Sequence, residues 1–229
     1  MKISIITLFP SMISGFLHES ILRRAQQKKL VEIEVVNLRN FAIDDYGTVD
    51  DRPYGGGAGM VLRVDVVFKA LEHLKSTSKD LKLKTILTSA RGKTYHQKMA
   101  QEYSLFDHII IIAGHYEGVD ERILNYVDEE ISIGDYVLTG GELPACILAD
   151  SITRLIPGVL KKEEAVQKES FSKIGKYTLL EYPQYTRPEK FDGKKVPSLL
   201  LSGDHKKIET WRHQQAIKQT KKKRPDLLL

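Results

Sequence analysis

The stretch His108-Ile109-Ile110-Ile111-Ile112-Ala113 decides the fold class. Four consecutive isoleucines leave no polar residue for a solvent-facing side, so both faces of this segment must point into a core. Strands buried on both faces are typical of parallel sheets that helices cover. Gly114-His115-Tyr116-Glu117-Gly118 follows at once, and ligands in open α/β sheets bind beyond the carboxyl ends of strands.

On both sides of this strand, the first 160 residues alternate between strand-like and helix-like segments. Apolar side chains recur at helical spacing in some segments, and β-branched residues dominate others. We expect strands over 2–9, 31–38, 84–89 and 108–113, and helices over 11–29, 64–74, 97–103 and 142–156. In the last helix, Ile147, Leu148, Ile152 and Leu155 would share one apolar face. This alternation predicts an α/β domain with a mainly parallel sheet.

Glycines gather in four short segments, residues 50–60, 88–94, 113–122 and 131–144. Glycine permits positive φ and a close approach of the backbone to a ligand. The segments 88–94 and 113–122 follow expected strands, and the segment 131–144 itself runs from a strand through Gly140-Gly141 to a helix. Three glycine loops after three successive strands predict one shared pocket. A flexible surface loop at 50–60 and a capped turn at 113–122 are the alternative interpretations.

The residues Gly92-Lys93-Thr94 match the last three residues of the phosphate-binding loop motif. That motif needs another glycine five residues before the glycine of the Gly-Lys pair. Leu87 occupies this position, inside an expected strand. The sequence therefore disfavours a nucleotide triphosphatase.

Charge is divided unevenly along the chain, whose formal net charge is +5. Residues 1–160 hold 18 Lys and Arg against 21 Asp and Glu, a net of −3, whereas residues 161–229 hold 17 against 9, a net of +8. This asymmetry indicates a polyanion that binds the C-terminal part. A basic tail that only aids solubility is the alternative.

The remaining composition indicates a cytoplasmic, soluble protein. Cys146 is the single cysteine, so the chain can form no internal disulfide. The apolar run at the N-terminus ends at Pro10 without a small-residue cleavage site, so we interpret it as a buried strand. No apolar stretch approaches the ~18 residues of a membrane span.

Several long motifs resemble those of the bacterial tRNA (guanine-N1)-methyltransferases, in order and spacing, over nearly the whole chain. The motifs are Asp50-Asp51-Arg52-Pro53-Tyr54-Gly55-Gly56-Gly57-Ala58-Gly59-Met60, Gly114-His115-Tyr116-Glu117-Gly118-Val119-Asp120-Glu121-Arg122, Ser132-Ile133-Gly134-Asp135-Tyr136-Val137-Leu138-Thr139-Gly140-Gly141-Glu142, Tyr182-Pro183-Gln184-Tyr185-Thr186-Arg187-Pro188 and Leu200-Leu201-Ser202-Gly203-Asp204-His205. The resemblance implies a SPOUT-type parallel sheet with a deep trefoil knot, a small, mostly helical C-terminal domain and a homodimer with a shared active site. The domains would be a knotted catalytic domain over 1–160, a flexible linker over 161–176 and a tRNA-binding domain over 177–229.

The same resemblance implies that S-adenosyl-L-methionine is the methyl donor and that the glycine-rich loops bind it. Carried over position by position, the donor pocket is lined by Ser89, Gly92, Gly114, Tyr116, Glu117, Ile133, Gly134, Tyr136, Leu138, Gly140, Gly141 and Pro144. Glu117 would face the cationic donor.

The family methylates N1 of the guanosine immediately 3′ of the anticodon, at position 37. Its catalytic residues are an aspartate and an arginine. The arginine corresponds to Arg154, but Glu169 stands where the family has aspartate. Glutamate keeps the acid and extends its reach by about 1.5 Å, one C–C bond. A general base is needed because N1 of guanine carries a proton, and the arginine would stabilise charge on O6. Glu181 is the second candidate for the base, and a solvated loop charge is the alternative role of Glu169.

RNA contacts are expected on both parts of the chain. Arg52, Tyr54, Gly55 and Gly59 would face the flipped guanosine. Phosphate contacts are expected from Arg187, Lys206, Lys207, Arg212, Lys221, Lys222 and Lys223. Trp211, the single tryptophan, either stacks on a base or lies in the core, and the core is the commoner place for such a residue. The resemblance also implies Mg²⁺ associated with the substrate, without a dedicated metal site.

Two other functions are open at this stage. One is an RNA methyltransferase of the same fold that acts on a ribose hydroxyl or another base. The other is an RNA-binding protein that keeps the donor pocket and has lost turnover. The motifs at 50–60 and 182–188 disfavour the first, and Arg154 together with an acid at 169 disfavours the second.

Overall fold

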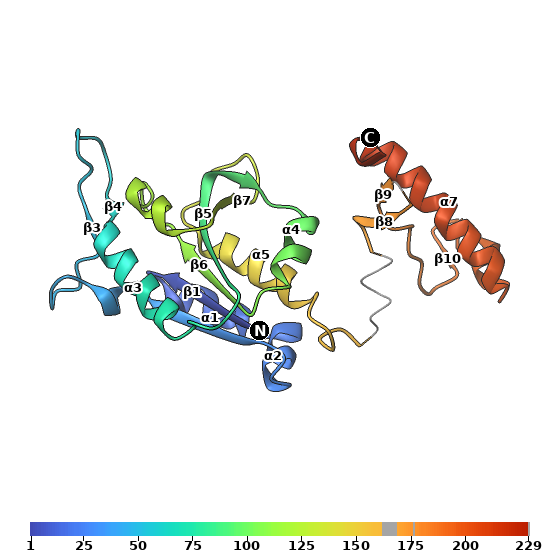
Figure 1. Cartoon of the computed structure of the whole chain (residues 1–229). Coiled ribbons are helices and arrows are strands. Elements are labelled where there is room, and N and C mark those ends of the chain that lie inside the picture. The colour runs from blue at the N-terminus through green and yellow to red at the C-terminus, as the bar shows by residue number, and fades with distance from the viewer. Residues whose placement is uncertain (162–168, 176, 229) are drawn as a thin grey trace. The chain divides into compact units, whose positions relative to one another are not determined.

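The computed structural model describes residues 1–161, 169–175 and 177–228. The chain divides into two compact units, Met1–Lys161 and Lys162–Leu229. Half of the expected linker, residues 162–168 and 176, lies outside the described residues. Figure 1 shows the elements of both units.

A five-stranded parallel sheet forms the centre of the first unit, in the order β2-β1-β6-β5-β7. Its strands are β1 (Lys2–Thr7), β2 (Glu32–Asn37), β5 (Leu83–Thr94), β6 (His108–Ala113) and β7 (Glu129–Ser132). The parallel sheet predicted from the sequence is thus confirmed. Strands β6 and β7 precede two of the glycine-rich segments, and β5, which lies between them, contains a third, residues 88–94. These three segments therefore lie next to one another.

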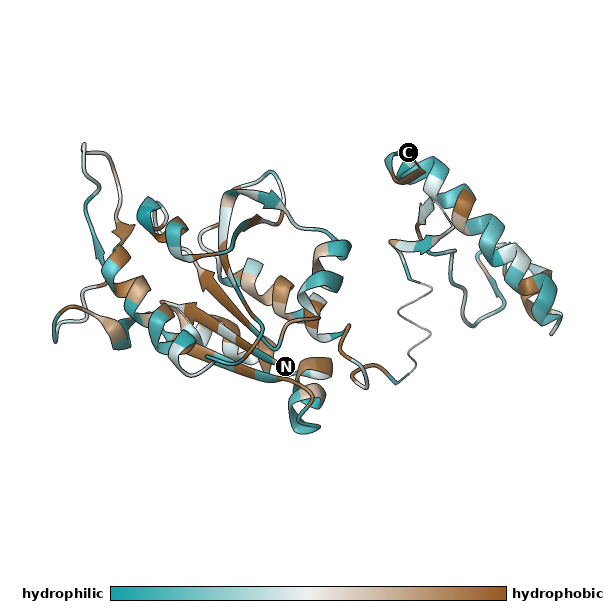
Figure 2. Cartoon of the chain, in the orientation of Figure 1, coloured by the Kyte–Doolittle hydropathy of each residue, from teal (hydrophilic) through white to brown (hydrophobic). Residues whose placement is uncertain are grey.

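Both faces of the sheet are covered, which explains the run of isoleucines. Ile109 and Ile111 pack into the core on one face, and Ile110 and Ile112 into the core on the other. The first core is completed by helices α1 (Pro10–Leu17), α2 (Ser20–Gln27), α4 (Gln97–Tyr103) and α5 (Glu142–Thr153). The second is completed by α3 (Val64–Ser76) and the short helices η1 (Leu38–Phe41) and η2 (Glu121–Tyr126). The hydropathy colours show the apolar strands between these layers (Figure 2).

Two helix predictions were wrong in detail. The expected helix over 11–29 is two helices, α1 and α2, because Ser20 has a φ of +51° and breaks the hydrogen-bond ladder. The expected helix over 142–156 ends at Thr153, and Ile147 is 45% exposed instead of lying in the core. The face of α5 that packs on the sheet carries Leu148 and Ile152.

Strand β5 is longer than predicted because it continues through Gly92 to Thr94. Its pairing with β7 shifts register between Thr88 and Lys93 and then resumes with Lys93 opposite Ile131. A Cβ on Gly92 would overlap the backbone of Glu130, so glycine is what allows the two strands to approach. Gly92-Lys93-Thr94 is therefore strand, not a phosphate-binding loop.

A narrow antiparallel pair, β3 (Asp50–Asp51) and β4 (Val61–Leu62), carries the glycine-rich loop 52–60 away from the sheet (Figure 1). The base of this loop is joined to the loop after β6. Leu62 N donates to Gly118 O at 2.9 Å, and Glu117 N donates to Met60 O at 3.0 Å. The first and third glycine-rich segments consequently lie side by side.

The second unit is built on one long helix, α7 (His205–Lys223). Around it lie the strand pairs β8 (Ser172–Ile174) with β9 (Tyr177–Leu179) and β10 (Lys190–Phe191) with β11 (Lys194–Lys195), and the short helices η3 (Ser198–Leu201) and η4 (Pro225–Leu228). Its small core contains Leu179, Ile208, Ala216 and Thr220. The described residues of the chain include no helix that is both long and apolar enough to cross a membrane.

Candidate functional site

Three glycine-rich segments meet at Thr88 within β5, at Gly114 after β6 and at Gly141 after β7. Gly141 N donates to Gly114 O at 2.6 Å, and Thr88 Oγ1 donates to Ile112 O at 3.1 Å. A Cβ on Gly141 would overlap Thr88 Oγ1 and would lie 2.7 Å from Gly114 N. Only glycine at 141 lets the three segments pack this closely.

A cavity of about 1170 Å³ opens beside this meeting point. It has room for a ligand of cofactor size, since such sites typically measure about 300–1,000 Å³. Eleven of the twelve residues predicted to bind the donor line it: Ser89, Gly114, Tyr116, Glu117, Ile133, Gly134, Tyr136, Leu138, Gly140, Gly141 and Pro144. Gly92 does not line the cavity, because its role is the close approach of β5 and β7.

The loop between β3 and β4 forms one wall of the same cavity. Arg52 and Tyr54 line it, whereas Gly55 and Gly59 do not. Gly59 instead has a φ of +85° and supports the wall, since a Cβ there would lie 2.5 Å from Glu117 Cγ. Tyr54 is fully exposed, so its ring is available to a bound molecule.

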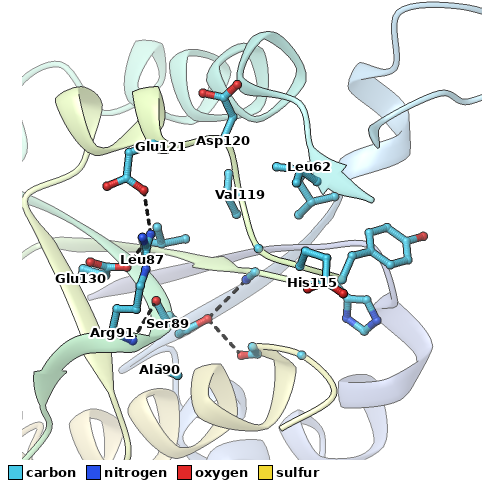
Figure 3. A pocket seen from close by; sticks show the side chains of 18 of the residues that line it. Leu62, Leu87, Ser89, Ala90, Arg91, His115, Val119, Asp120, Glu121 and Glu130 are labelled. Carbon is cyan, nitrogen blue, oxygen red and sulfur yellow. Dashed lines mark hydrogen bonds and ion pairs between the residues drawn. The ribbon is translucent and has the colours of Figure 1, made fainter. Parts of the chain in front are cut away.

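Arginines and acids that line the cavity form ion pairs, and Figure 3 shows Arg91 between Glu121 and Glu130. The pairs are Arg63 with Asp65 and Asp51, Arg122 with Asp120, and Arg91 with Glu121 and Glu130. Hydrogen bonding to Arg63 lowers the pKa of Asp65, and hydrogen bonding to Arg122 lowers the pKa of Asp120. Within these pairs the opposite charges neutralise one another.

Two acids of the cavity stand apart from this pattern. Within the described part of the chain, the Glu117 carboxylate has no ion-pair partner. Glu130 Oε1 is shielded from solvent and accepts no hydrogen bond, although the Arg91 guanidinium lies 3.6 Å away. A cation near Glu117 and an amino group near Glu130 would satisfy these oxygens.

A buried polar chain behind the cavity was missed from the sequence. Thr7 Oγ1 donates to Glu142 Oε1 at 2.9 Å, and Glu142 Oε2 lies 3.3 Å from Nδ1 of His115, which lines the cavity. Thr7 and Glu142 are fully buried. The only sequence signals are that His115 lies inside one glycine motif and Glu142 follows another, while nothing marks Thr7, 135 residues away from Glu142.

The predicted catalytic residues lie in different units. Arg154 follows the last residue of α5 and is half-buried. Glu169 and Glu181 belong to the second unit, where both are half-buried. Glu181 Oε1 accepts a hydrogen bond from Gln184 Nε2 at 2.5 Å, and the backbone carbonyl of Glu169 accepts one from Ser172 N at 3.2 Å.

Most of the predicted phosphate-binding residues of the second unit are exposed: Arg187, Lys206, Lys207, Lys221, Lys222 and Lys223. Arg212 differs, because its guanidinium lies 4.9 Å from the centre of the Tyr182 ring and its Nε is buried without a hydrogen bond. Arg212 therefore packs within the unit. Among the residues that the structure describes, no three His, Cys, Asp or Glu side chains are grouped as metal ligands would be.

Comparison with known proteins gives matches along the whole chain. A family model described as tRNA (Guanine-1)-methyltransferase TrmD matches residues 1–229. Relatives named tRNA (guanine-N(1)-)-methyltransferase include one from Staphylococcus carnosus, 52% identical over 229 residues, which covers 100% of this chain and 91% of the relative. Another, from Dictyoglomus turgidum, is 50% identical over 228 residues, which cover 100% of this chain and 90% of the relative. A third, from Clostridioides difficile, is 50% identical over 228 residues, with 99% and 97% covered.

Proposed function

Because the chain belongs to the tRNA (guanine-1)-methyltransferase family, we propose that it transfers a methyl group from S-adenosyl-L-methionine to N1 of guanosine 37 in tRNA. The observation that carries this proposal is the meeting of three glycine-rich segments at one cavity of about 1170 Å³. The deep trefoil knot of the family is part of the proposal. The contacts among Thr88, Gly114 and Gly141 support it, since a knot needs its three loops to cross at close range.

The cavity fits the methyl donor on three counts. Its glycines expose backbone groups, Ile133, Leu138 and Pro144 supply apolar contact area, and the unpaired Glu117 carboxylate faces a site suited to a cation. When bound, the donor supplies an activated methyl group. The chain holds that donor in place and presents the guanine to it.

Two side chains would act on the guanine. We assign Glu169 as the general base that removes the N1 proton, so that the N1 lone pair becomes nucleophilic. Arg154 would stabilise the negative charge that develops on O6. The glutamate is a reasonable substitute for the family's aspartate, because the reference pKa values are about 4.3 and 3.9.

The position of Arg154 supports a homodimer with a shared active site. Arg154 lies ten residues after Pro144, which lines the cavity. At 1.5 Å per helical residue, the two Cα atoms are about 15 Å apart. An arginine side chain is much shorter than this, so we propose that each cavity receives Arg154 of the partner subunit.

An exposed apolar face supplies the surface for that dimer. Helices α1 and α5 lie next to each other, and each presents two large apolar side chains four residues apart. Met12 and Phe16 are each 49% exposed, Leu143 is 51% exposed and Ile147 is 45% exposed. Apolar side chains gathered in this way mark an interface, and continuity with the cavity favours a second copy of this chain.

The substrate would be bound by both units. Arg52 and Tyr54 would contact the flipped guanosine, with Gly55 and Gly59 shaping their loop. The exposed lysines of α7 and Arg187 would hold phosphates. A tRNA substrate would be met in the cytoplasm, and any Mg²⁺ would enter with the RNA.

Methyl transfer from labelled donor to two tRNA transcripts tests the target position. One transcript carries guanosine at position 37 and the other adenosine. We expect label in the first only. Equal labelling of both transcripts would contradict the assignment of position 37.

Substitution of the two acids tests the base. Glu169→Gln keeps the shape of the side chain and removes its basicity, so we expect a fall in kcat of about 10²–10⁴, the usual contribution of a general base. Glu181→Gln is the matched control, with kcat within a few fold of the unmodified enzyme. A large fall in kcat for Glu181→Gln but not for Glu169→Gln would identify Glu181 as the general base instead.

A further inference from the structure

The second unit has a small hollow on α7 that the proposed reaction does not use. It measures about 320 Å³ and is lined by Leu199, Lys206, Lys207, Thr210, Trp211 and Gln214. Large apolar, basic and amide side chains are thus combined within about two and a half turns of one helix and the neighbouring η3. This combination suits a nucleobase joined to a phosphate.

The hollow lies on the side of α7 opposite the core of its unit. Ile208, Ala216 and Thr220 are the buried side chains of the helix. At roughly 100° per residue, these three positions cover about 0–120° around the axis, and the hollow-lining residues cover about 160–300°. Trp211 is therefore not a core residue, against the commoner role considered from the sequence.

The Trp211 ring is oriented without being covered. Its centre lies 6.4 Å from that of the Tyr185 ring, at an interplanar angle of 52°, and the residue remains half-buried. A tryptophan fixed by a neighbour on one side and open to a hollow on the other can stack on a base at little cost in side-chain entropy. The aromatic contact thus prepares a stacking surface.

The polar groups around the ring complete the arrangement. Within the described residues, Lys206 makes no ion pair and the Gln214 amide makes no side-chain hydrogen bond, while Lys207 is paired with Asp204 at 3.0 Å. A free ammonium can hold a phosphate, and a free amide can read the edge of a base. The net charge of +8 over residues 161–229 favours an anionic ligand.

From these observations we propose that the hollow binds one unpaired nucleotide of the RNA substrate. The base stacks on Trp211, its edge faces Gln214 and its phosphate contacts Lys206. The site rests on the proposed function, because it supposes that RNA is the substrate. It is separate from the cavity of the first unit, and it would secure the tRNA rather than take part in methyl transfer.

Trp211 provides its own probe, because it is the only tryptophan of the chain. Titration of the full-length protein with tRNA should quench its fluorescence, with saturation at the same concentration as binding measured by gel shift. A short single-stranded RNA should quench it, and an RNA duplex of equal length should not. Unchanged emission at saturating tRNA would overturn the proposal, even if methyl transfer proceeds normally.

Variants separate stacking from folding. Base stacking by an aromatic side chain corresponds to a loss of about 5- to 150-fold in affinity when it is replaced by alanine. We expect a loss in this range for Trp211→Ala, a smaller loss for Trp211→Phe, and a few-fold loss for Gln214→Ala, each as a raised KM for tRNA with kcat retained. Lys206→Ala should also reduce the salt dependence of binding by about one counterion, whereas Lys69→Ala, an exposed lysine of α3, should not.

Failure of this site and failure of the proposed function give different results. If the enzyme methylates tRNA but the Trp211 and Gln214 variants bind it within twofold of the unmodified protein, the nucleotide site is wrong. If emission responds to a protein partner and not to RNA, the hollow binds protein. If no RNA is methylated at all, the proposed function is wrong whatever the fluorescence shows.

Discussion

We expect the hydroxyl group of Thr7 to contribute more to the free energy of unfolding than its methyl group does. Thr7 Oγ1 donates to the buried Glu142 carboxylate at 2.9 Å and accepts from Phe9 N, also at 2.9 Å. Thr7→Val keeps the volume of the side chain and removes both hydrogen bonds. Thr7→Ser keeps both bonds and removes one buried methyl group, and is therefore the matched control.

The expected magnitudes follow from these contacts. A hydrogen bond to a charged group contributes about 1.5–3 kcal/mol, and an unpaired backbone N–H costs about 1–3 kcal/mol when buried. Phe9 is only half-buried, so we expect Thr7→Val to lower the free energy of unfolding by about 2–4 kcal/mol. Loss of one buried methyl in Thr7→Ser should cost about 1 kcal/mol.

Urea unfolding followed by circular dichroism measures both values. The protein concentration must be equal throughout, because the stability of a dimer depends on it. Donor binding should weaken in Thr7→Val as well, since Glu142 orients His115 at the cavity wall. A Thr7→Val protein as stable as the unmodified one, or more stable than Thr7→Ser, would refute this reasoning.

Three further predictions concern the cavity, the buried histidine and the dimer. Gly59→Ala should weaken donor binding about tenfold, as measured by calorimetry, because the added Cβ would displace Glu117 and overpacking costs about 1–3 kcal/mol. An unchanged affinity would show that Glu117 does not bind the donor. Burial lowers the pKa of His108 below 6.5. As the pH falls, this histidine is therefore protonated in the unfolded chain before it is protonated in the folded one. The free energy of unfolding should be constant above about pH 6.5 and fall below it by up to about 1.4 kcal/mol per pH unit. His108→Gln should flatten that fall in urea unfolding at pH 5–8, and an unaltered slope would assign the effect to other groups. If the protein forms the proposed dimer, Phe16→Ser should convert it to a monomer in light scattering and abolish methyl transfer, whereas a monomeric unmodified protein would contradict the shared active site.

The elements most clearly predicted from the sequence are those whose pattern has one physical explanation. The isoleucine strand was placed residue for residue at His108–Ala113, because only a strand buried on both faces accommodates it. The helix Gln97–Tyr103 was also placed correctly. The break at Ser20 and the exposure of Ile147 depend on tertiary packing and on a surface suited to a partner, which local periodicity does not encode.

The glycines of the sequence indicated where the candidate site lies, but nothing in the sequence indicated the buried residues that pack behind it. Glycine clusters predicted where backbone would approach closely, and Gly114 and Gly141 do meet at the cavity. Gly92, which the family resemblance implies as a donor-binding residue, lies against the backbone of Glu130 and does not line the cavity. Thr7 and Glu142 could not be paired in advance, because contacts between residues 135 positions apart leave no local pattern.

The identity of the methylated nucleoside tests the central claim most directly. A tRNA transcript with guanosine at position 37 would be incubated with labelled S-adenosyl-L-methionine and the full-length protein, digested to nucleosides and analysed by mass spectrometry. We expect the label to appear as N1-methylguanosine. Label in a ribose-methylated nucleoside or at another atom of the base, or tight donor binding without transfer, would contradict it.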